Sequence, residues 1–286
     1  MAGSLAGCRG VLTGDTPGSF VGSVALSDAK DGRRQAVSST TLAGVEPLLA
    51  ARRFVAFGLS HGVVIAAVAV VAAVLVAVGR RHRGTAIELP LSRAFAVVFA
   101  ALLIPVEFSW LSPGQSGIVH SLPLQLCDLA AMATVWALWS HSPTAFALTY
   151  FWGLTLTLQA FLSPELTGPD FPSLEFFSFF GMHSLVLWAA IYLTWGVGLR
   201  PDWHSYRVTV LVTIGWAVVM FAVNHVAGTN YGFLNAKPHA SSLLDLLGPW
   251  PFYLLSELAL ITVVWAFITY PWTRRTHSAG TISHCG

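Results

Sequence analysis

Seven long apolar runs, separated by short polar stretches, dominate the chain after its first fifty or so residues. They extend approximately over Phe54–Gly79, Ala94–Leu111, Val119–Trp139, Thr144–Leu162, Leu174–Leu199, Val208–Ala227 and Trp250–Trp272. Each has roughly the ~20 residues that a helix needs to cross a bilayer. Lipid cannot satisfy backbone N–H and C=O groups, and no alternating pattern typical of barrel strands is present. The sequence therefore predicts an all-α fold, a polytopic membrane helix bundle with seven transmembrane helices.

The segments that flank these runs differ in composition from the runs themselves. Residues 1–53 are rich in Gly, Ser and Ala, show no apolar period and lack the apolar core of a signal peptide. We therefore expect a disordered N-terminal tail over 1–53, a seven-helix transmembrane domain over 54–273 and a short cytoplasmic tail over 274–286.

Composition and charge support a membrane protein and indicate its orientation. Hydrophobic residues make up 55% of the chain and charged residues only 10%, less than half of the usual share. The formal net charge of +2 gives no reason to expect a nucleic-acid partner. Basic residues follow the first, fifth and seventh runs, whereas Lys237 stands alone in the later loops of the opposite side; the first group comprises Arg80, Arg81, Arg83, Arg93, Arg200, Arg207, Arg274 and Arg275. The positive-inside rule predicts a cell-membrane protein with its N-terminus outside and its C-terminus cytoplasmic, although Arg52 and Arg53 favour the reverse.

In this orientation the strongly polar residues of the runs all fall in the outer half of the bilayer. They are His61, Glu107, His120, Gln125, Cys127, Asp128, Gln159, His183, Asn224, His225 and Glu257. Such residues are costly in spanning helices and usually face the bundle interior or a wet cavity. We expect a shared cavity open toward the outer leaflet. The alternative is that these residues form interhelical hydrogen bonds that hold the bundle together.

Cys127 lies inside an apolar run, unlike Cys8 and Cys285 in the tails. Three scattered cysteines form no disulfide framework and no CxxC zinc pair, so Cys127 is either an inert buried thiol or a reactive one. His120, Leu124 and Cys127 follow the i, i+4, i+7 spacing of one helix face, and Pro123 suits a first turn. Cys127 would then lie one or two turns from a helix N-terminus, whose dipole favours a thiolate.

Several motifs, taken in order, give the chain a family resemblance. They are Leu122-Pro-Leu-Gln-Leu-Cys127, Tyr150-Phe-Trp-Gly153, Gln159-Ala160, Ser163-Pro164, Phe176-Phe177, Met182-His183, Arg200-Pro201, Asn224, Gly228-Thr-Asn230-Tyr231, Phe233-Leu234, Lys237-Pro238, Leu244-Asp245 and Leu247-Gly-Pro-Trp-Pro251 with Tyr253. Over Phe54 to the C-terminus the chain resembles the YwaF-like family of bacterial integral membrane proteins. That family is related to the eukaryotic transmembrane protein 164, a cysteine-centred acyltransferase acting on lysophospholipids.

The resemblance implies a thiol nucleophile at Cys127 and a base at His183, both already candidates from their depth. The expected activity is that of a thiol-dependent acyltransferase or lipid hydrolase acting on phospholipid or lysophospholipid esters, without a cofactor. His120 is the alternative base, and Asp128 or Glu257 could orient a histidine. Gln159, Asn224 or His225 could donate hydrogen bonds to the oxyanion. Gln125 is a further supporting residue, at a position where many relatives are expected to have His.

Three further questions stay open from the sequence. Asn230, Tyr231 and Lys237 could meet a phosphate headgroup, or could belong to a turn shaped by Gly228, Asn230 and Gly232. A non-enzymatic lipid- or solute-binding protein or carrier would use the same cavity with Cys127 inert. A metal or haem site would use His61, His120, His183 and His225 with Cys127, without HxxxH or CxxC spacing. The sequence fixes neither the lipid, the acyl acceptor nor the oligomeric state.

Overall fold

Helices are the only extended regular elements in the part of the chain that the structure describes. The structure is a computed structural model, and it describes residues 53–110, 122–164, 166, 168–237 and 243–280. Its elements are α2 (Leu59–His82), α3 (Glu88–Trp110), α5 (Leu126–Ser140), α6 (Pro143–Leu154), α7 (Leu156–Leu162), α8 (Leu174–Ile191), the π-helix η1 (Tyr192–Val197), α9 (Trp203–Ala227), the 3₁₀ helices η2 (Tyr231–Phe233) and η3 (Leu243–Leu247), and α10 (Phe252–Gly280). No strand occurs within these ranges, and the predicted all-α class is confirmed. The predicted tail before Arg53 lies outside them.

Six helical segments are long and apolar enough to cross a membrane. They are Leu59–His82, Glu88–Phe108, Pro143–Leu162, Leu174–Val197, Trp203–Ala227 and Phe252–Arg274. The seventh apolar helix, α5, has 15 residues and is therefore about 22 Å long. That length is shorter than the ~30 Å hydrocarbon layer. Two of the predicted spans are also composite, because α6 and α7 are separated at Thr155 and α8 continues into η1.

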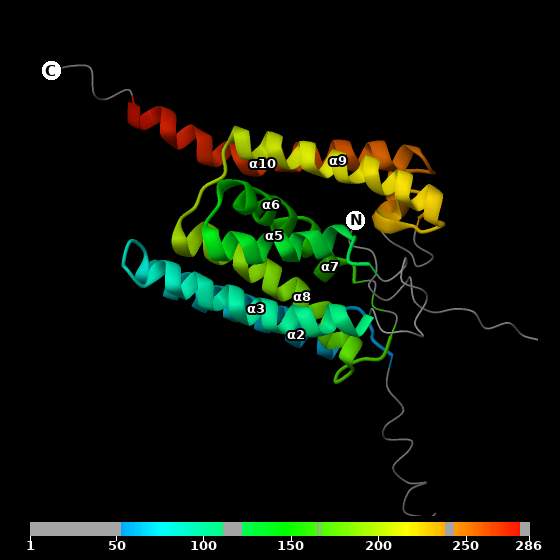
Figure 1. The fold of residues 1–286 in the computed structure, drawn as a ribbon, viewed down its shortest axis with the longest axis horizontal. Coiled ribbons are helices and arrows are strands. Elements are labelled where there is room, and N and C mark those ends of the chain that lie inside the picture. Colours follow the sequence, from blue (N-terminus) through cyan, green and yellow to red (C-terminus); the bar gives the residue numbers. More distant parts are fainter. Residues whose placement is uncertain (1–52, 111–121, 165, 167, 238–242, 281–286) are drawn as a thin grey trace, which may run out of the picture.

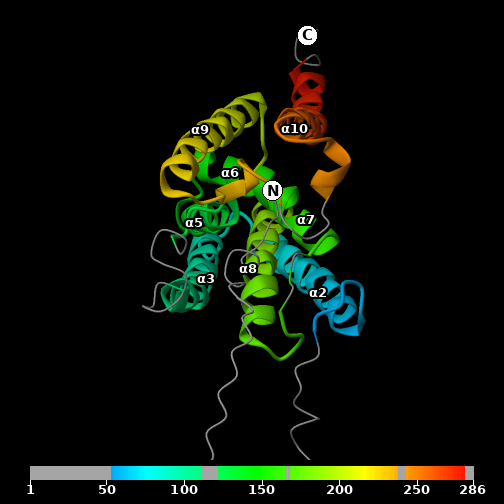
Figure 2. The same cartoon turned by 90° about the vertical axis from the view of Figure 1, so that its right-hand side faces the viewer.

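The helices form three layers (Figures 1 and 2). Helices α9 and α10 lie on one side and α2 and α3 on the other, with α5 to α7 between them; α8 runs from this middle layer to a position between α2 and α3. The middle layer is mostly buried, whereas the four outer helices expose large apolar side chains such as Val63, Val70, Leu211 and Phe267. Apolar surface of that extent is unfavourable in water and favourable against lipid. The protein is accordingly an integral membrane protein.

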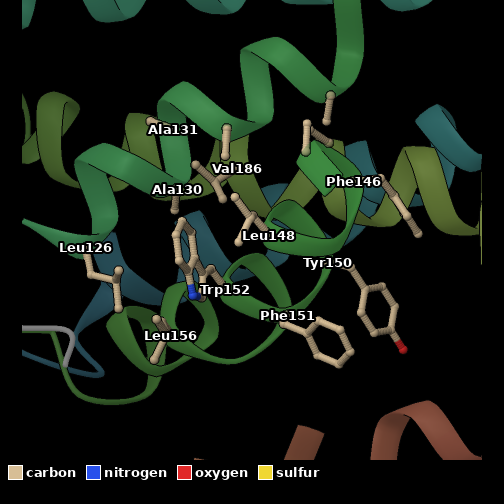
Figure 3. Close-up of a cluster of buried hydrophobic side chains, with 14 of the residues drawn as sticks. Leu126, Ala130, Ala131, Phe146, Leu148, Tyr150, Phe151, Trp152, Leu156 and Val186 are labelled. Carbon is tan, nitrogen blue, oxygen red and sulfur yellow. The ribbon is translucent and has the colours of Figure 1, made fainter. Parts of the chain in front are cut away.

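Small residues allow the middle layer to pack closely. Gly153 of α6 faces α8 so tightly that an added Cβ would lie 2.9 Å from the Cβ of Ala190. Trp152 fills the space beside α5, where Figure 3 shows it directed toward the face that carries Leu126 and Ala130. In a membrane the apolar lipid gives helices no hydrophobic reason to associate, so close packing of this kind holds the bundle together.

Indole N–H groups connect the layers through hydrogen bonds. The Nε1 of Trp152 donates to the Thr213 hydroxyl of α9 at 3.0 Å. The Nε1 of Trp188 on α8 donates to the Val68 carbonyl of α2 at 2.9 Å. Because lipid offers no hydrogen-bond acceptor to a buried indole, each indole needs such a partner, and each bond fixes two helices in one register.

The helix connections gather at opposite ends of the bundle (Figure 1). The start of α5 and the connection from α9 to α10 lie at one end, which we call the cysteine end after Cys127. The connections α2–α3, α5–α6 and η1–α9 lie at the other, which we call the arginine end after Arg80, Arg83, Arg93 and Arg200. Hydrogen bonds join elements within each end, for example from Arg93 Nε to the Trp139 carbonyl at 3.1 Å.

At the arginine end, α2 and η1 approach each other through two glycines. A Cβ added to Gly79 would lie 2.7 Å from the Cα of Gly196, a distance that requires the backbones to move apart. At Gly62, on the same helix, an added Cβ would meet no atom of another element within 4 Å in the described part of the chain.

These two positions make a matched pair of alanine substitutions. Gly79→Ala is expected to lower the free energy of unfolding by about 1–3 kcal/mol, because overpacking displaces one helix from the other. Gly62→Ala gains the same helix propensity without a clash and is expected to be neutral or slightly stabilising. Thermal unfolding of the purified protein in detergent measures both; equal melting temperatures would contradict the contact.

The N-terminus of α9 is capped by a carboxylate outside the membrane-spanning segment. Asp202 Oδ1 accepts hydrogen bonds from the Ser205 N–H and hydroxyl, both at 2.7 Å. The pKa of Asp202 lies below its usual range because the backbone N–H and then the hydroxyl of Ser205 donate to the ionised form. The stabilising contribution of this cap is complete above the unfolded-state pKa of about 3.9 and is lost as pH falls through the lower folded-state value.

Replacing this cap tests both its energy and its titration. Asp202→Ala is expected to lower the free energy of unfolding at neutral pH by about 1 kcal/mol. Asp202→Asn keeps a good cap but cannot titrate, so it should stay near wild type at pH 7 and lose less stability on acidification. Melting temperatures measured between neutral and acidic pH distinguish the three proteins, and parallel curves would contradict the assigned titration.

Candidate functional site at the cysteine end

The helix that carries Cys127 begins inside the predicted third run, not at its start. Gln125 is the N-cap with extended backbone (φ −65°, ψ 152°), so α5 starts at Leu126 and Cys127 is its second residue. The predicted helical face through Leu124 is therefore wrong, and Pro123 precedes the helix instead of occupying its first turn. The cause is local capping, because Asp128 Oδ2 accepts from the Gln125 N–H at 2.9 Å. His120 lies outside the described residues.

The Cys127 thiol lies in the first turn of α5, closer to the helix N-terminus than predicted. It is half-buried and packs against the main apolar core. Its Sγ is 3.9 Å from Asp128 Oδ1, to which the thiol donates. Asp128 and Glu107 of α3 are both near enough to act on the thiol electrostatically. The thiol proton thus already has an acceptor beside it, although Asp128 is also occupied in capping the helix.

An apolar cavity of about 260 Å³ opens between α3 and α8. Two polar residues, Glu107 and Ser178, line it. The rest of the lining is apolar and consists of Phe99, Leu102, Leu103, Val106, Leu174, Phe177, Gly181, Met182 and Leu185. The Ser178 hydroxyl is buried and has no hydrogen-bond partner within the described ranges. A largely apolar cavity with a few polar groups is the usual form of a small-molecule site. Cys127 does not line this cavity, but Glu107, which does, acts electrostatically on the Cys127 thiol.

His183 is buried on α8, one residue beyond the cavity-lining Met182. Its Nδ1 is 2.6 Å from the Phe179 carbonyl, which can only accept, so Nδ1 carries the hydrogen. In a neutral ring Nε2 is then the acceptor, the tautomer that a general base requires. No hydrogen bond joins His183 to Cys127 in the described structure, although α5 and α8 pack side by side.

The start of α5 is also bound to the connection after α9. Gln125 Oε1 accepts from the Gly232 N–H at 3.0 Å, and the Trp216 indole of α9 donates to the Leu124 carbonyl at 3.1 Å. Gly232 has φ +65°, and a Cβ there would collide with the Trp216 ring at 2.3 Å. Gln125 therefore joins two elements far apart in sequence, a role that its position in the sequence did not indicate.

Asn224 shapes the turn that follows α9. Its Oδ1 accepts from the Thr229 hydroxyl at 2.8 Å and the Tyr231 N–H at 2.7 Å, and its Nδ2 donates to the Tyr231 carbonyl at 3.0 Å. Gly228 follows the helix with φ +68°. The turn interpretation of this segment agrees with these contacts. The roles proposed for Asn224 as an oxyanion donor and for Tyr231 as a headgroup contact stay predictions.

The remaining loop residues support the same turn. Asn230 Oδ1 accepts from the Asn235 and Ala236 N–H groups at 3.1 and 3.2 Å. Lys237 pairs with Asp245 at 3.5 Å and lies 5.5 Å from the centre of the Tyr253 ring. The Tyr253 hydroxyl donates to the Phe233 carbonyl. Lys237 thus connects the loop to η3 and α10, and contact with a headgroup is untested.

Other predicted site residues are dispersed. His61 is buried among phenylalanine rings, with Nδ1 accepting from the Phe57 N–H at 2.9 Å. His225 is exposed although its neighbour Asn224 is buried, Gln159 is half-buried on α7, and Glu257 is buried on α10 near Tyr253. Within the described ranges no three His, Cys, Asp or Glu residues are grouped to hold a metal ion.

The sequence interpretation missed Ser178 and Trp216. Ser178, Gly181 and Leu185 do follow the i, i+3, i+7 spacing of one helix face, which could have identified the cavity wall. Trp216 is hydrogen-bonded to Leu124, 92 residues earlier in the sequence, and no local sequence pattern predicts that contact.

Asn224 and His225 provide adjacent substitutions with opposite expectations. Asn224→Ala removes three hydrogen bonds of a buried side chain and should lower the free energy of unfolding by about 2 kcal/mol or more. His225→Ala changes an exposed side chain and should stay within about 0.5 kcal/mol of wild type. Thermal unfolding, together with limited proteolysis of residues 228–237, measures the difference. A stable Asn224→Ala with an unchanged cleavage pattern would contradict the assigned role.

A known protein family matches this chain. The model of the TMEM164 family matches residues 56–269, which is most of the chain and includes all of the elements around Cys127. No curated protein and no solved structure matches.

Proposed function

This chain belongs to the TMEM164 family, and we propose that it is a thiol-dependent acyltransferase or lipid hydrolase acting on the acyl esters of phospholipids. The observation that carries the proposal is the placement of a half-buried thiol in the first turn of a helix, within electrostatic reach of Glu107, which lines an apolar cavity. The cavity suits an acyl chain, and the helix N-terminus favours negative charge on the sulfur. Membership of the bacterial YwaF-like branch stays a prediction.

The proposed reaction uses Cys127 as nucleophile and His183 as base. The thiol proton passes to His183 Nε2, and the thiolate attacks the ester carbonyl. The carbon–oxygen bond to the lysolipid breaks, a thioester forms on Cys127, and the departing alkoxide takes the proton from His183. The hydroxyl of a second lysolipid, or water, then attacks the thioester and restores the thiol. Catalytic hydrogen bonds often tighten only when substrate is bound, and the reaction requires Sγ and Nε2 to come together in that way.

We further propose the cell membrane as the location, with the cysteine end facing outward. The basic residues of the arginine end, among them Arg80, Arg81, Arg83, Arg93 and Arg200, contrast with the single Lys237 in the later loops of the cysteine end. The positive-inside rule places the basic side in the cytoplasm, so substrate would reach Cys127 from the outer leaflet.

The thioester provides the test. Purified wild-type protein in bilayer discs is incubated with phospholipid whose acyl chain is isotopically labelled, and covalent label is measured before and after neutral hydroxylamine, which cleaves thioesters. Wild type should carry hydroxylamine-sensitive label, Cys127→Ala should carry none, and His183→Ala should be labelled at least about 100-fold more slowly because the proton acceptor is lost.

The other two cysteines supply the matched control. The double variant Cys8→Ala/Cys285→Ala should label like wild type. Label that survives in Cys127→Ala would remove the thiol from the mechanism. Wild type that binds the lipid reversibly in the cavity, without ever forming a thioester, would support the lipid-binding or carrier alternative.

A further inference from the structure

A second cavity lies at the arginine end, on the opposite side of the bundle from Cys127. It has a volume of about 410 Å³ and lies between α2, η1 and α10. Its lining combines three guanidinium groups with two indoles: Arg80, Arg83 and Arg200 with Trp195 and Trp272, completed by Thr194, Gly198 and Pro271. No carboxylate forms an ion pair with any of the three arginines in the part of the chain that the structure describes.

Backbone contacts fix two of these guanidinium groups. Arg80 Nε donates to the Trp195 carbonyl and Arg83 Nε to the Gly196 carbonyl, each at 3.1 Å. Gly198 has φ +95°, and a Cβ there would lie 2.2 Å from an Arg83 Nη atom, so the guanidinium lies directly against the chain. Both groups are oriented through Nε, and their Nη hydrogens have no partner among the described residues.

The third guanidinium is oriented differently. Arg200 lies 5.9 Å from the centre of the Trp272 ring, and no carbonyl accepts from it within the described ranges. The π-helix η1 contributes to this arrangement, because it carries Trp195 and Gly196, whose carbonyls orient the other two arginines. Segments of π-helix are frequent at functional sites.

Capping and membrane orientation explain only part of this cluster. Arginines near a helix C-terminus satisfy its last carbonyls, which accounts for the Nε contacts of Arg80 and Arg83. Arg93 is an arginine that only caps a helix. Its Nε donates to the Trp139 carbonyl, its guanidinium lies 5.3 Å from the centre of the Trp139 ring, and it does not line the cavity. Capping accounts neither for Arg200 nor for the gathering of three arginines around one cavity without an ion-pair partner among the described residues.

We propose that this cavity binds a phosphate group, either of an anionic phospholipid headgroup or of a free phosphate compound. Guanidinium groups bind phosphate oxygens through paired N–H donors, and three of them would neutralise a phosphate and its neighbouring oxygens. The indoles and Pro271 form an apolar wall suited to the glycerol portion of a lipid at the membrane surface. The proposal is independent of Cys127 and of the reaction proposed above.

Binding to the purified, delipidated full-length protein tests it, with Arg200→Gln as the variant and Arg93→Gln as the matched control. Phosphatidylglycerol, phosphatidylcholine and inorganic phosphate serve as probes, read out by ligand-dependent melting temperature and by native mass spectrometry. Wild type and Arg93→Gln should bind phosphatidylglycerol equally and in preference to phosphatidylcholine. The Kd of Arg200→Gln for phosphatidylglycerol should be about tenfold higher, because this variant loses charge-assisted hydrogen bonds to the phosphate.

The outcomes separate the sources of the phosphate. Equal stabilisation by inorganic phosphate would assign the site to a free phosphate compound, whereas stabilisation by the lipid alone would assign it to a headgroup. If Arg200→Gln does not fold, Arg200→Lys keeps the charge but loses the forked donor and should still bind more weakly than wild type. Wild-type affinity in the Arg200 variants, or an equal loss in Arg93→Gln, overturns the proposal.

Discussion

Gln125, Leu126 and Asp128 at the start of α5 are buried, so the first backbone N–H groups of this helix depend on partners within the protein. A helix that starts inside a bundle needs polar partners supplied by the chain itself. Asp128 provides one for the Gln125 N–H, and Gln125 in turn accepts from Gly232 of the loop after α9. The position of Cys127 in the first turn depends on this arrangement, because the cap determines where the helix begins. The same contacts bring the Asn224 turn against the helix start, so capping and loop structure form a single unit.

The apolar runs predicted the helices well, because length and hydropathy decide which segments can cross a bilayer. The alternating directions of the helices also predicted which residues meet at each end, and Cys127, Gln125 and Asn224 indeed lie at one end. The start of α5 was not predictable in this way. Pro123 matched the first-turn signal, but the cap formed by Asp128 lies five residues later and its strength depends on buried surroundings. The conversion of α8 into a π-helix likewise depends on contacts with α2 that no local pattern carries.

In the candidate site, too, some features were predictable from the sequence and others depend on tertiary packing. Depth along the helices selected Cys127 and His183, and the structure gives the histidine a tautomer suited to accepting a proton. Depth also selected His61 and His225, one of which is enclosed by phenylalanine rings while the other is exposed. Position along a helix axis gives the level of a side chain in the membrane but not the direction in which it points. Direction depends on packing between layers, as in the contact between Trp216 and Gly232.

The shortness of α5 has a consequence for the lipids themselves. Met132, Trp136 and Trp139 expose part of α5 at the surface of the bundle, where its neighbours are spans of 20 residues or more. This hydrophobic mismatch favours local thinning of the bilayer along that face. Thinning lowers the glycerol backbone of adjacent lipids toward the midplane, and with it the ester carbonyls. For the reaction proposed above, such thinning would bring the ester bond closer to the level of the Cys127 sulfur while the lipid stays in its leaflet.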